Sequence, residues 1–536
     1  MAVETRLEAV PAATAAAAIR SWDRGWLLPL LLGVVLAAVT AIPYVYAYLA
    51  QPAGQVFMGF IFLGDDANTY LAKMREGWEG ALGWTNRYTS EPSPPAFLFL
   101  FWLGLGRLAA VLHLPLLLTF HLARVAGAFS LLAAAWAFIR HFVEDPRARK
   151  FALFFLAFGL GFGYVVQALG HPVVLGEKSD TLDWRMPELS AFYSILALPH
   201  FTWSVVFQAL GVVLTLAAAE KASLRLGLLG GLAWLGQASI HPQMPVLMGG
   251  ALAAALLLRP VGRRGYLAAA VALLIPAPYV AYSYLAFVGN PEVVRWTFHS
   301  KNGVPPDLFS MVFALAPQLL LALPGAWLAA HRRSRADLFL LAWIAGLLAI
   351  LLLPNPAGDL RRRFFDGIYL LLVALAAHGL YGVLLPRIRS LKARNLVPFT
   401  WIVYSTVGSW FLILAPIANA TDAQYALTTS QYSALAWLGS QPRGLVLSSP
   451  QMGLYVPAYT SDTVYVGHYD ETFNYFGKAQ QAFDAFSGRT DLRAFAAENG
   501  IRYVLWTRGF GSDTPPSALG PPAFSAEGVA VFDLRT

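Results

Sequence analysis

Apolar stretches long enough to cross a membrane recur along most of this chain, from Trp26 to about Pro416. The hydrocarbon core of a bilayer is roughly 30 Å thick, and a helix of about 20 predominantly apolar residues crosses it. A secretory signal peptide supplies a single short apolar segment, so it cannot account for the repetition. The composition agrees, since 57% of the 536 residues are hydrophobic and only 13% are charged. We therefore predict a polytopic α-helical membrane protein.

About eleven membrane-spanning helices are expected, because short polar loops separate the apolar stretches. The first runs from about Trp26 to Tyr48, and the others cover roughly 117–140, 151–169, 199–219, 226–240, 243–258, 266–288, 308–330, 337–353, 367–385 and 397–416. Segment 95–112 is also apolar, but counting it as a span would place the later basic loops on the outer side. We interpret it as a re-entrant or interfacial helix.

The basic residues predict the orientation in the membrane, because Lys and Arg concentrate in cytoplasmic loops. With eleven spans, the tail 1–24 and five basic interhelical loops fall on one side; these loops are 147–150, 221–225, 259–264, 332–335 and 387–394. We expect an integral protein of the plasma (inner) membrane with a cytoplasmic N-terminus. The net charge of +8 comes from these loops rather than from one basic stripe, so we expect no nucleic-acid partner. Without cysteine, the chain has no disulfide or thiol chemistry.

The C-terminal part differs in texture from the rest. The transmembrane module is predicted to span 25–416, with outer loops at 49–116 and 170–198, and an extracytoplasmic α/β domain to span 417–536. The domain contains the β-rich runs GLVLSS, TVYVGH and IRYVLW and a helical stretch around Phe473 to Phe486, separated by Gly, Pro and Ser turns.

Two adjacent acids, Asp65 and Asp66, stand in the first outer loop just before a helical stretch that carries Tyr70 and Met74 one turn apart. A carboxylate at this position can act as a general base. The alternative is a helix N-cap, which short acidic side chains favour strongly. The presence of two adjacent acids weakens this alternative, because capping alone does not explain both of them.

The second outer loop adds acids and histidines. Asp183 and Glu188 are candidates for a second acid or for ligands of a divalent metal, Mg²⁺ or Mn²⁺; the alternative is an ordinary solvated acidic loop. His200 and His241 fall near the outer face and are candidates for binding a polar headgroup or for completing helix ends. The spacing of these residues matches no known zinc pattern.

Three arginines, Arg361, Arg362 and Arg363, precede a predicted span on the outer side and violate the charge rule that the other loops obey. Guanidinium groups match phosphate oxygens well, so we expect an anionic ligand there. The alternatives are ordinary phospholipid headgroups or pairing with Asp359 and Asp366. Lys301 is a weaker second cation.

These motifs resemble those of the GT-C superfamily of integral membrane glycosyltransferases. GDDANTYLAKMREG followed by EPSPPAFLFLFWLGLG is similar to that family's acidic motif and the helix after it, and LPNPAGDLRRRFFDGIYLLLVALAAHGL resembles its late-helix arginine element. MPELSAFYSILALPHF and YVGHYDETFNYFGK are similar to an outer-loop junction and to an end domain of bacterial members. The chain departs from many relatives at Ala67, where they carry Glu, and it has no WWD-type acceptor motif.

The resemblance implies a sugar donor linked to polyprenyl phosphate and bound among membrane lipids. By that likeness Asp66, or Asp65, is the base, and Arg362 and Arg363 meet the carrier phosphate. Further substrate-binding candidates are Arg361, His200, His241, Lys301 and Tyr70. The main alternative function is a transporter or flippase for an anionic or lipid-linked substrate, and a second is a lipid-binding scaffold. Transporters place ionisable groups at the bilayer midplane and show repeated halves, whereas this sequence shows neither.

Overall fold

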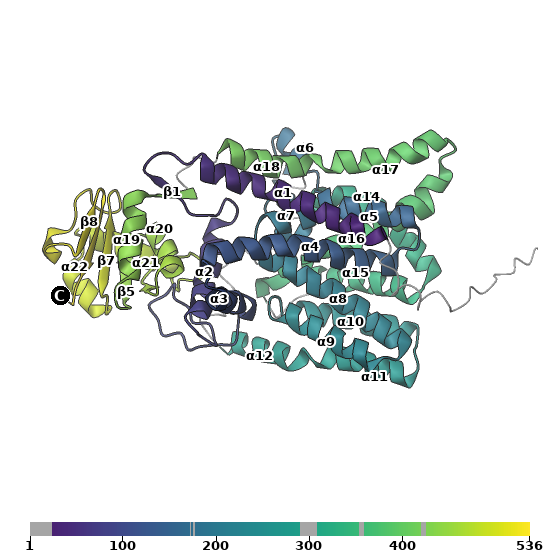
Figure 1. Ribbon diagram of the computed structural model, residues 1–536, viewed down its shortest axis with the longest axis horizontal. Coiled ribbons are helices and arrows are strands. Elements are labelled where there is room, and N and C mark those ends of the chain that lie inside the picture. Colours follow the sequence, from purple (N-terminus) through teal and green to yellow (C-terminus); the bar gives the residue numbers. More distant parts are fainter. Residues whose placement is uncertain are drawn as a thin grey trace, which may run out of the picture.

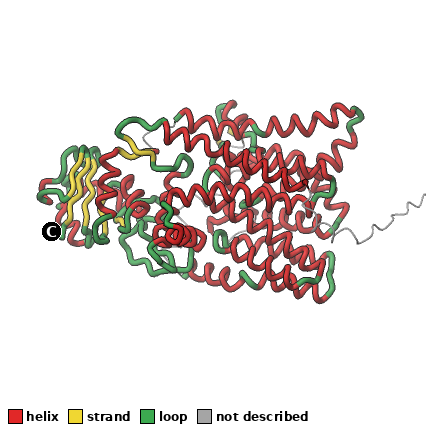
Figure 2. Tube along the Cα trace, in the orientation of Figure 1, coloured by secondary structure: helices red, strands yellow, loops and turns green. Residues whose placement is uncertain are grey.

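A computed structural model describes residues 24–171, 173–174, 177–178, 180–289, 308–352, 358–419 and 425–535 of the chain. It shows a long bundle of helices with a smaller domain, containing most of the strands, at one end (Figures 1 and 2). This domain is the C-terminal part of the chain, coloured yellow-green to yellow in Figure 1. The predicted fold class, a polytopic α-helical membrane protein with a C-terminal sheet region, is confirmed.

Eight helical segments of the described residues are long and apolar enough to cross a membrane. These segments are Leu27–Leu49, Leu116–Phe142, Pro199–Lys221, Arg263–Val288, Phe309–Arg332, Arg335–Leu352, Arg361–Arg387 and Leu391–Ala418. They contain helices α1 (Leu27–Leu49), α4 (Leu116–Phe142), α8 (Pro199–Lys221), α11 (Arg263–Leu274), α12 (Ala277–Val288), α14 (Leu308–Arg332), α15 (Arg335–Leu352), α16 (Ile368–Ala377), α17 (Leu391–Ser405) and α18 (Val407–Ala418). At 1.5 Å per residue, even the shortest segment, with 18 residues, approaches the thickness of the hydrocarbon core.

Three predicted spans correspond to shorter helices. Helix α5 (Pro146–Phe158) has 13 residues, and α9 (Leu224–Ala238) and α10 (Met244–Leu258) have 15 each. A helix of 15 residues is only about 22 Å long. The number of spans, about eleven, therefore stays a prediction.

Two helices, α2 (Gly64–Trp78) and α3 (Leu100–Leu112), lie beside the C-terminal domain at the end of the bundle (Figure 1). Their backbones meet at two glycines: a Cβ on Gly77 would stand 2.1 Å from the Leu103 carbonyl oxygen, and one on Gly106 would stand 1.8 Å from that of Met74. No side chain fits there. Helix α3, with 13 residues, reaches only about 20 Å and is too short to cross the membrane by itself.

The C-terminal domain contains a five-stranded sheet in the order β6-β5-β7-β9-β8. Its strands are β5 (Leu445–Ser448), β6 (Thr463–Val464), β7 (Tyr503–Thr507), β8 (Phe524–Ala526) and β9 (Val529–Asp533), and its helices are α19 (Thr429–Gly439), α20 (Pro450–Tyr459), α21 (Tyr475–Phe486) and α22 (Leu492–Glu498). Strands β6, β5 and β7 are parallel, and β9 and β8 add antiparallel pairs. The three β-rich runs of the sequence supply β5, β6 and β7.

The C-terminal domain is joined to the first outer loop by backbone and side-chain bonds. Strand β1 (Gln55–Phe57) pairs antiparallel with β4 (Ala426–Thr428). Helix α2 contributes Lys73, whose Nζ lies 2.5 Å from Glu471 Oε1, and Arg75, which donates to the Ala458 carbonyl. Segments nearly 400 residues apart in the sequence are thereby held in contact, which defines the space between the domain and the bundle.

Candidate active site

A cavity of about 490 Å³ lies where α2, the bundle and the C-terminal domain meet. Its polar lining comes from several separate segments and includes Asp66, Asn86, His200, His241, Arg363, His468, Asp470 and Glu471. Its apolar lining includes Ile240, Pro242, Val246, Val280 and Phe287. The cavity thus has one side suited to a polar, reacting group and one side suited to hydrocarbon.

Asp66 is the predicted acid that lines this cavity, and Asp65 is not among the lining residues. Helix α2 begins with Leu63 at its N-cap, and that cap has no side-chain hydrogen bond. Neither Asp65 nor Asp66 therefore serves as the N-cap of α2. The helix dipole still favours negative charge at this first turn.

His468 of the C-terminal domain faces Asp66, with its Nε2 3.5 Å from Asp66 Oδ1. Its Nδ1 accepts a hydrogen bond from the Asp470 backbone N–H, so the proton of a neutral ring belongs on Nε2, toward the carboxylate. Burial raises the pKa of Asp66, but the hydrogen bond and charge of His468, with the charges of Arg363 and Lys73, lower it below its usual value. Burial also opposes the charged form of His468, yet Asp66 and neighbouring acids raise its pKa. The two groups stabilise each other's charged forms.

The pKa values of Asp65 and Asp66 move in opposite directions. Burial and the charge of Asp66 raise the pKa of Asp65, while His468 partly lowers it. A third acid, Asp470, lines the cavity, and its pKa is raised to about 6, chiefly by burial. Asp66 is therefore the most readily ionised carboxylate of this group, and Asp470 is closest to titrating at neutral pH.

The three arginines differ in position. Arg363 lines the cavity and its Nη1 lies 3.1 Å from Glu188 Oε1. Arg362 Nε is 3.8 Å from the same oxygen and its Nη2 donates to the Arg185 carbonyl, whereas Arg361 donates to the Leu351 carbonyl. The segment is a 3-10 helix, Gly358–Phe365, in which consecutive side chains point about 120° apart. Of these three arginines, Arg363 is therefore the one that lines the cavity.

His200 and His241 both line the cavity, and their rings lie 5.6 Å apart. His241 Nδ1 is 2.8 Å from Asp366 Oδ2, which also accepts from Ser204, so only Nε2 remains for a ligand. His200 is 3% exposed, and neither of its ring nitrogens has a hydrogen-bond partner in the described structure. A buried ring with two unsatisfied nitrogens is costly, and a polar ligand in the cavity would relieve that cost.

Tyr70 also lines the cavity and stacks on Trp102, with ring centroids 4.4 Å apart and an interplanar angle of 15°. His200 lies 4.7 Å from the Tyr70 ring. Lys73 Nζ is held over the rings of Tyr70 and Phe99 at 5.2 and 4.6 Å. This aromatic group gives the polar side of the cavity a rigid wall.

The apolar side of the cavity opens between α10 and α12. Val246 and Tyr284 line it and are both 61% exposed. Ser283 is the one buried residue of α12, so this helix packs loosely against its neighbours. Its tyrosines are tied to the first outer loop, since Tyr279 donates to the Phe97 carbonyl and Tyr282 accepts from the Phe97 N–H. A long apolar chain can reach the cavity from this side.

The two candidate metal ligands, Asp183 and Glu188, are bonded to other groups of the protein. Glu188 is fully buried and bonded to guanidinium groups, and Asp183 Oδ2 accepts from the Gly163 backbone N–H. Within the described residues, no three His, Cys, Asp or Glu side chains converge so as to hold a metal ion. Because Mg²⁺ can also be held by one or two carboxylates together with a substrate phosphate, the dependence on Mg²⁺ or Mn²⁺ stays a prediction. Lys301, the other predicted cation, lies outside the described residues.

Sequence reasoning missed the contribution of the C-terminal domain. His468, Asp470 and Glu471 lie four to seven residues after the end of β6, and ligand-binding groups commonly lie beyond the carboxyl ends of parallel strands. The polar run HYDET after the strand TVYV was the available indication. The partner of Asp66 could not be named from it, because that pairing depends on how the domain docks.

The fold resembles those of solved membrane glycosyltransferases, although no protein-family model and no curated protein matches the chain. The apo oligosaccharyltransferase of Archaeoglobus fulgidus aligns with a TM-score of 0.54 and 14% identity over 91% of this chain and 70% of its own. The arabinofuranosyltransferase AftD from Mycobacteria gives 0.56 and 15% over 96% of this chain, which spans 40% of that protein.

ArnT from Cupriavidus metallidurans, bound to undecaprenyl phosphate, aligns with a TM-score of 0.52 and 15% identity over 95% of this chain and 98% of its own. These likenesses extend over nearly the whole chain, helical bundle and end domain included. The chain has the fold of the GT-C superfamily of membrane glycosyltransferases.

Proposed function

We propose that the protein transfers a sugar from a polyprenyl-phosphate carrier to an acceptor hydroxyl at the outer face of the membrane. The observation that carries this proposal is that Asp66 and Arg363 line one cavity. Such a reaction needs one group that accepts the proton of the attacking hydroxyl and another that stabilises the negative charge of the departing phosphate. A carboxylate suits the first task and a guanidinium group the second. The neighbouring GT-C structures, one of them holding undecaprenyl phosphate, support a lipid-linked donor.

The reaction is a single displacement. The acceptor oxygen attacks the anomeric carbon while Asp66 takes the hydroxyl proton. The bond between the anomeric carbon and the phosphate oxygen breaks, and its electron pair stays on the carrier phosphate. Arg363 stabilises that charge as it develops. Attack on one face with departure from the other inverts the configuration of the sugar.

His468 is a positioning residue in this proposal. Its Nε2 holds Asp66 Oδ1 in one orientation, which leaves the other carboxylate oxygen for the acceptor. The lowered pKa of Asp66 keeps it ionised at neutral pH. His241, oriented by Asp366, and His200 supply hydrogen bonds to the bound sugar or phosphate, and the polyprenyl tail occupies the apolar side between α10 and α12.

The test is an assay of the purified full-length protein with radiolabelled sugars linked to undecaprenyl or dolichyl phosphate. Removing a positioned base typically costs roughly 100- to 10,000-fold, so Asp66→Asn should lose most turnover. Asp65→Asn is the matched control and should stay within a few-fold of the wild type. Full activity in Asp66→Asn would overturn the assignment, and loss in Asp65→Asn alone would move the base to Asp65.

The same assay separates the alternatives. Covalent transfer supports the proposed reaction, translocation of unchanged donor across vesicles would support a flippase, and binding alone would support a scaffold. Addition of EDTA, Mg²⁺ or Mn²⁺ tests the expectation of a divalent metal. Asp470→Asn is informative as well, because Asp470 shares the cavity and its pKa of about 6 suits a general base.

A further inference from the structure

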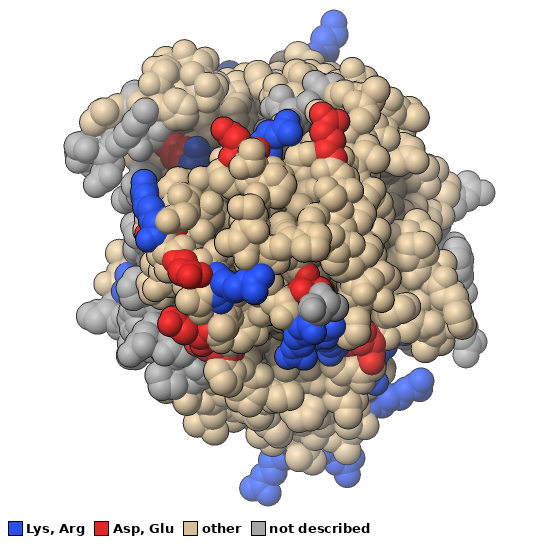
Figure 3. Space-filling model, turned by 90° about the vertical axis from the view of Figure 1, so that its left-hand side faces the viewer, with Lys and Arg blue, Asp and Glu red and all other residues tan. Residues whose placement is uncertain are grey.

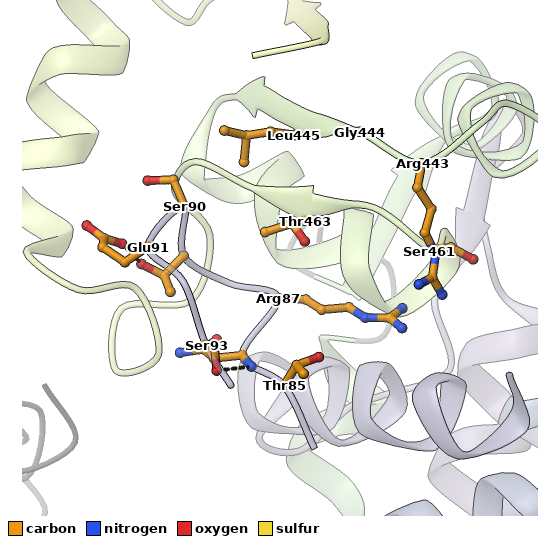
Figure 4. A pocket seen from close by; sticks show the side chains of 12 residues that line it. Thr85, Arg87, Ser90, Glu91, Ser93, Arg443, Gly444, Leu445, Ser461 and Thr463 are labelled. Carbon is orange, nitrogen blue, oxygen red and sulfur yellow. Dashed lines mark hydrogen bonds between the residues drawn. The ribbon is translucent and has the colours of Figure 1, made fainter. Parts of the chain in front are cut away.

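A second cavity, of about 430 Å³, lies between the first outer loop and the beginnings of strands β5 and β6 (Figure 4). We call it the polar cleft. Half of its twelve lining residues carry a hydroxyl group: Thr85, Thr89, Ser90, Ser93, Ser461 and Thr463. Leu445 is its single large apolar side chain. The cleft is within the usual size range of small-molecule sites, but it lacks the aromatic and aliphatic lining that lipid or peptide anchors need.

The charged groups at the cleft are already paired within the protein. Glu79 bonds both Arg87, at 2.6 Å, and Arg443, and Glu91 lies 2.6 Å from Lys478 Nζ. The side chains of Arg87 and Lys478 are 8% and 7% exposed. An anion would have to compete with the carboxylates of Glu79 and Glu91 for these cations, which disfavours phosphate as the occupant.

The hydroxyl groups at the cleft retain acceptor capacity. Thr85 donates to Glu76, Thr89 to Glu91 and Ser461 to Glu79, so carboxylates take the hydroxyl protons of these three residues. The hydroxyl oxygens of Thr85 and Ser461 keep lone pairs that can accept, whereas that of Thr89 already accepts from the Phe473 N–H and from Lys478 Nζ. A ligand that donates several hydrogen bonds therefore fits the cleft, and the uncharged molecules with that property are polyols such as sugars.

The polar cleft adjoins the cavity of the candidate active site. Asn86 and Ser93 line both, and the Asn86 backbone N–H donates to Ser93 Oγ. Asn86 also donates through Nδ2 to the Glu471 carbonyl, beside the reacting end of the cavity. The two spaces are therefore adjacent, and a chain of sugar units that passes over Asn86 and Ser93 would reach from Asp66 to the cleft.

We infer that the polar cleft binds the neutral saccharide units of an extended glycan acceptor, whose terminal hydroxyl lies at Asp66. The acceptor role depends on the proposed sugar transfer, whereas saccharide binding by the cleft does not. A glycan acceptor uses the cleft, while a lipid or peptide acceptor would leave it empty.

The test measures binding of neutral linear oligosaccharides of one to six units, from the malto-, cello- and manno- series, to the purified full-length protein by calorimetry. At least one series should bind, with affinity that rises with length. Thr463→Trp on β6 fills the cleft and should weaken binding at least tenfold. Ser525→Trp is the matched control, because β8 is the edge strand on the opposite side of the same sheet and Ser525 is exposed.

Thr463→Val removes the hydroxyl, keeps the volume and suits a strand, so it remains informative if the Trp variant does not fold. It should weaken binding by a smaller factor. Absence of binding in all three series, or equal binding in Thr463→Trp and the wild type, would overturn the inference. Inorganic phosphate that binds with the same dependence on Thr463 would also overturn it, in favour of an anion site.

Asp66→Asn distinguishes the two proposals. It should abolish transfer while oligosaccharides still bind. If the wild type binds oligosaccharides but transfers no sugar, saccharide binding by the cleft is supported and the proposed reaction is refuted. If sugar is transferred to a short acceptor and Thr463→Trp does not change the rate, the proposed reaction is supported and the role of the cleft in acceptor binding is refuted.

Discussion

His468 contacts Asp66 but takes no part in the bonds that form or break in the proposed sugar transfer. Its effect should therefore be on the protonation and orientation of Asp66. In His468→Ala, we expect kcat to fall about tenfold or more with little change in the KM of the donor. Because His468 lowers the pKa of Asp66, its removal raises that pKa and moves the acid limb of the activity profile to higher pH. His468→Gln, which retains a donor, should restore much of the rate. Equal losses in both variants with an unmoved acid limb would indicate a purely structural role.

Arg363 is the arginine expected to meet the carrier phosphate. Arg363→Ala should raise the KM of the polyprenyl donor at least tenfold, and Arg363→Lys should recover part of it, because Lys keeps the charge but not the planar fork. Titration of the donor measures this. Arg361→Ala is the control, since Arg361 does not line the cavity. Arg362→Ala should act more weakly than Arg363→Ala; the reverse order would contradict the proposed placement.

Arg363 also neutralises the buried Glu188, so part of its effect can be structural. Glu188→Gln combined with Arg363→Ala separates the two contributions, because the double variant leaves no buried charge unpaired. If the donor affinity of the double variant returns to the wild-type value, Arg363 acts through Glu188 rather than on the phosphate.

The short helices of the second outer loop are held by an acid with no role in the proposed reaction. Asp183 lies in the 3-10 helix Leu182–Trp184 and accepts from the backbone of Gly163, at the start of α6 (Gly163–Ala168). Burial raises its pKa to about 7, and the charge of Asp180 adds to that shift. An acid with a raised folded-state pKa favours folding below its unfolded pKa of about 4, and that contribution is lost as pH rises through about 7.

Asp183→Asn should therefore flatten the fall of Tm between pH 4 and pH 8. At pH 8 the variant should be the more stable protein, by an amount on the order of a few kcal/mol if the side chain packs unchanged, since each pKa unit corresponds to about 1.4 kcal/mol. Thermal unfolding of wild type and variant across this range measures the effect. Parallel Tm profiles would show that Asp183 does not titrate in this range.

At the level of elements, apolar length and strand patterns in the sequence predict the membrane helices and strands β5, β6 and β7. The first two turns of α2, with Asp66 and Tyr70, were also foreseeable from a short acidic motif before a helix. The sequence could not decide which of three adjacent arginines faces the cavity, because that depends on the local 3-10 geometry. Strand β8 was missed because it has only three residues, whereas β9 was missed although its five residues, VAVFD, form a run as long as β7.

At the scale of the whole molecule, acidic and basic side chains lie side by side on the end formed by the C-terminal domain, where neither sign forms a continuous stripe (Figure 3). This fits a surface that meets neutral glycans or lipids better than one that meets nucleic acid.

The absence of cysteine makes the membrane orientation directly testable. Ser525→Cys on β8 should react with a membrane-impermeant maleimide in intact cells, because the C-terminal domain is expected outside. Arg389→Cys, in an exposed position of a predicted cytoplasmic loop, should react only after the membrane is permeabilised. The cysteine-free parent controls for background labelling. The opposite pattern would put the C-terminal domain in the cytoplasm and refute an active site at the outer face.

The ion pair between Lys73 and Glu471 joins residues 398 positions apart. At a translation rate of about 5–20 residues per second, the C-terminal half of this contact emerges some tens of seconds after the first. Throughout that interval Asp66 has been synthesised, whereas His468 has not. In a nascent or truncated chain, no histidine would orient Asp66 when a lipid carrier binds. The chain would therefore become catalytically active only when the last part of it has been synthesised.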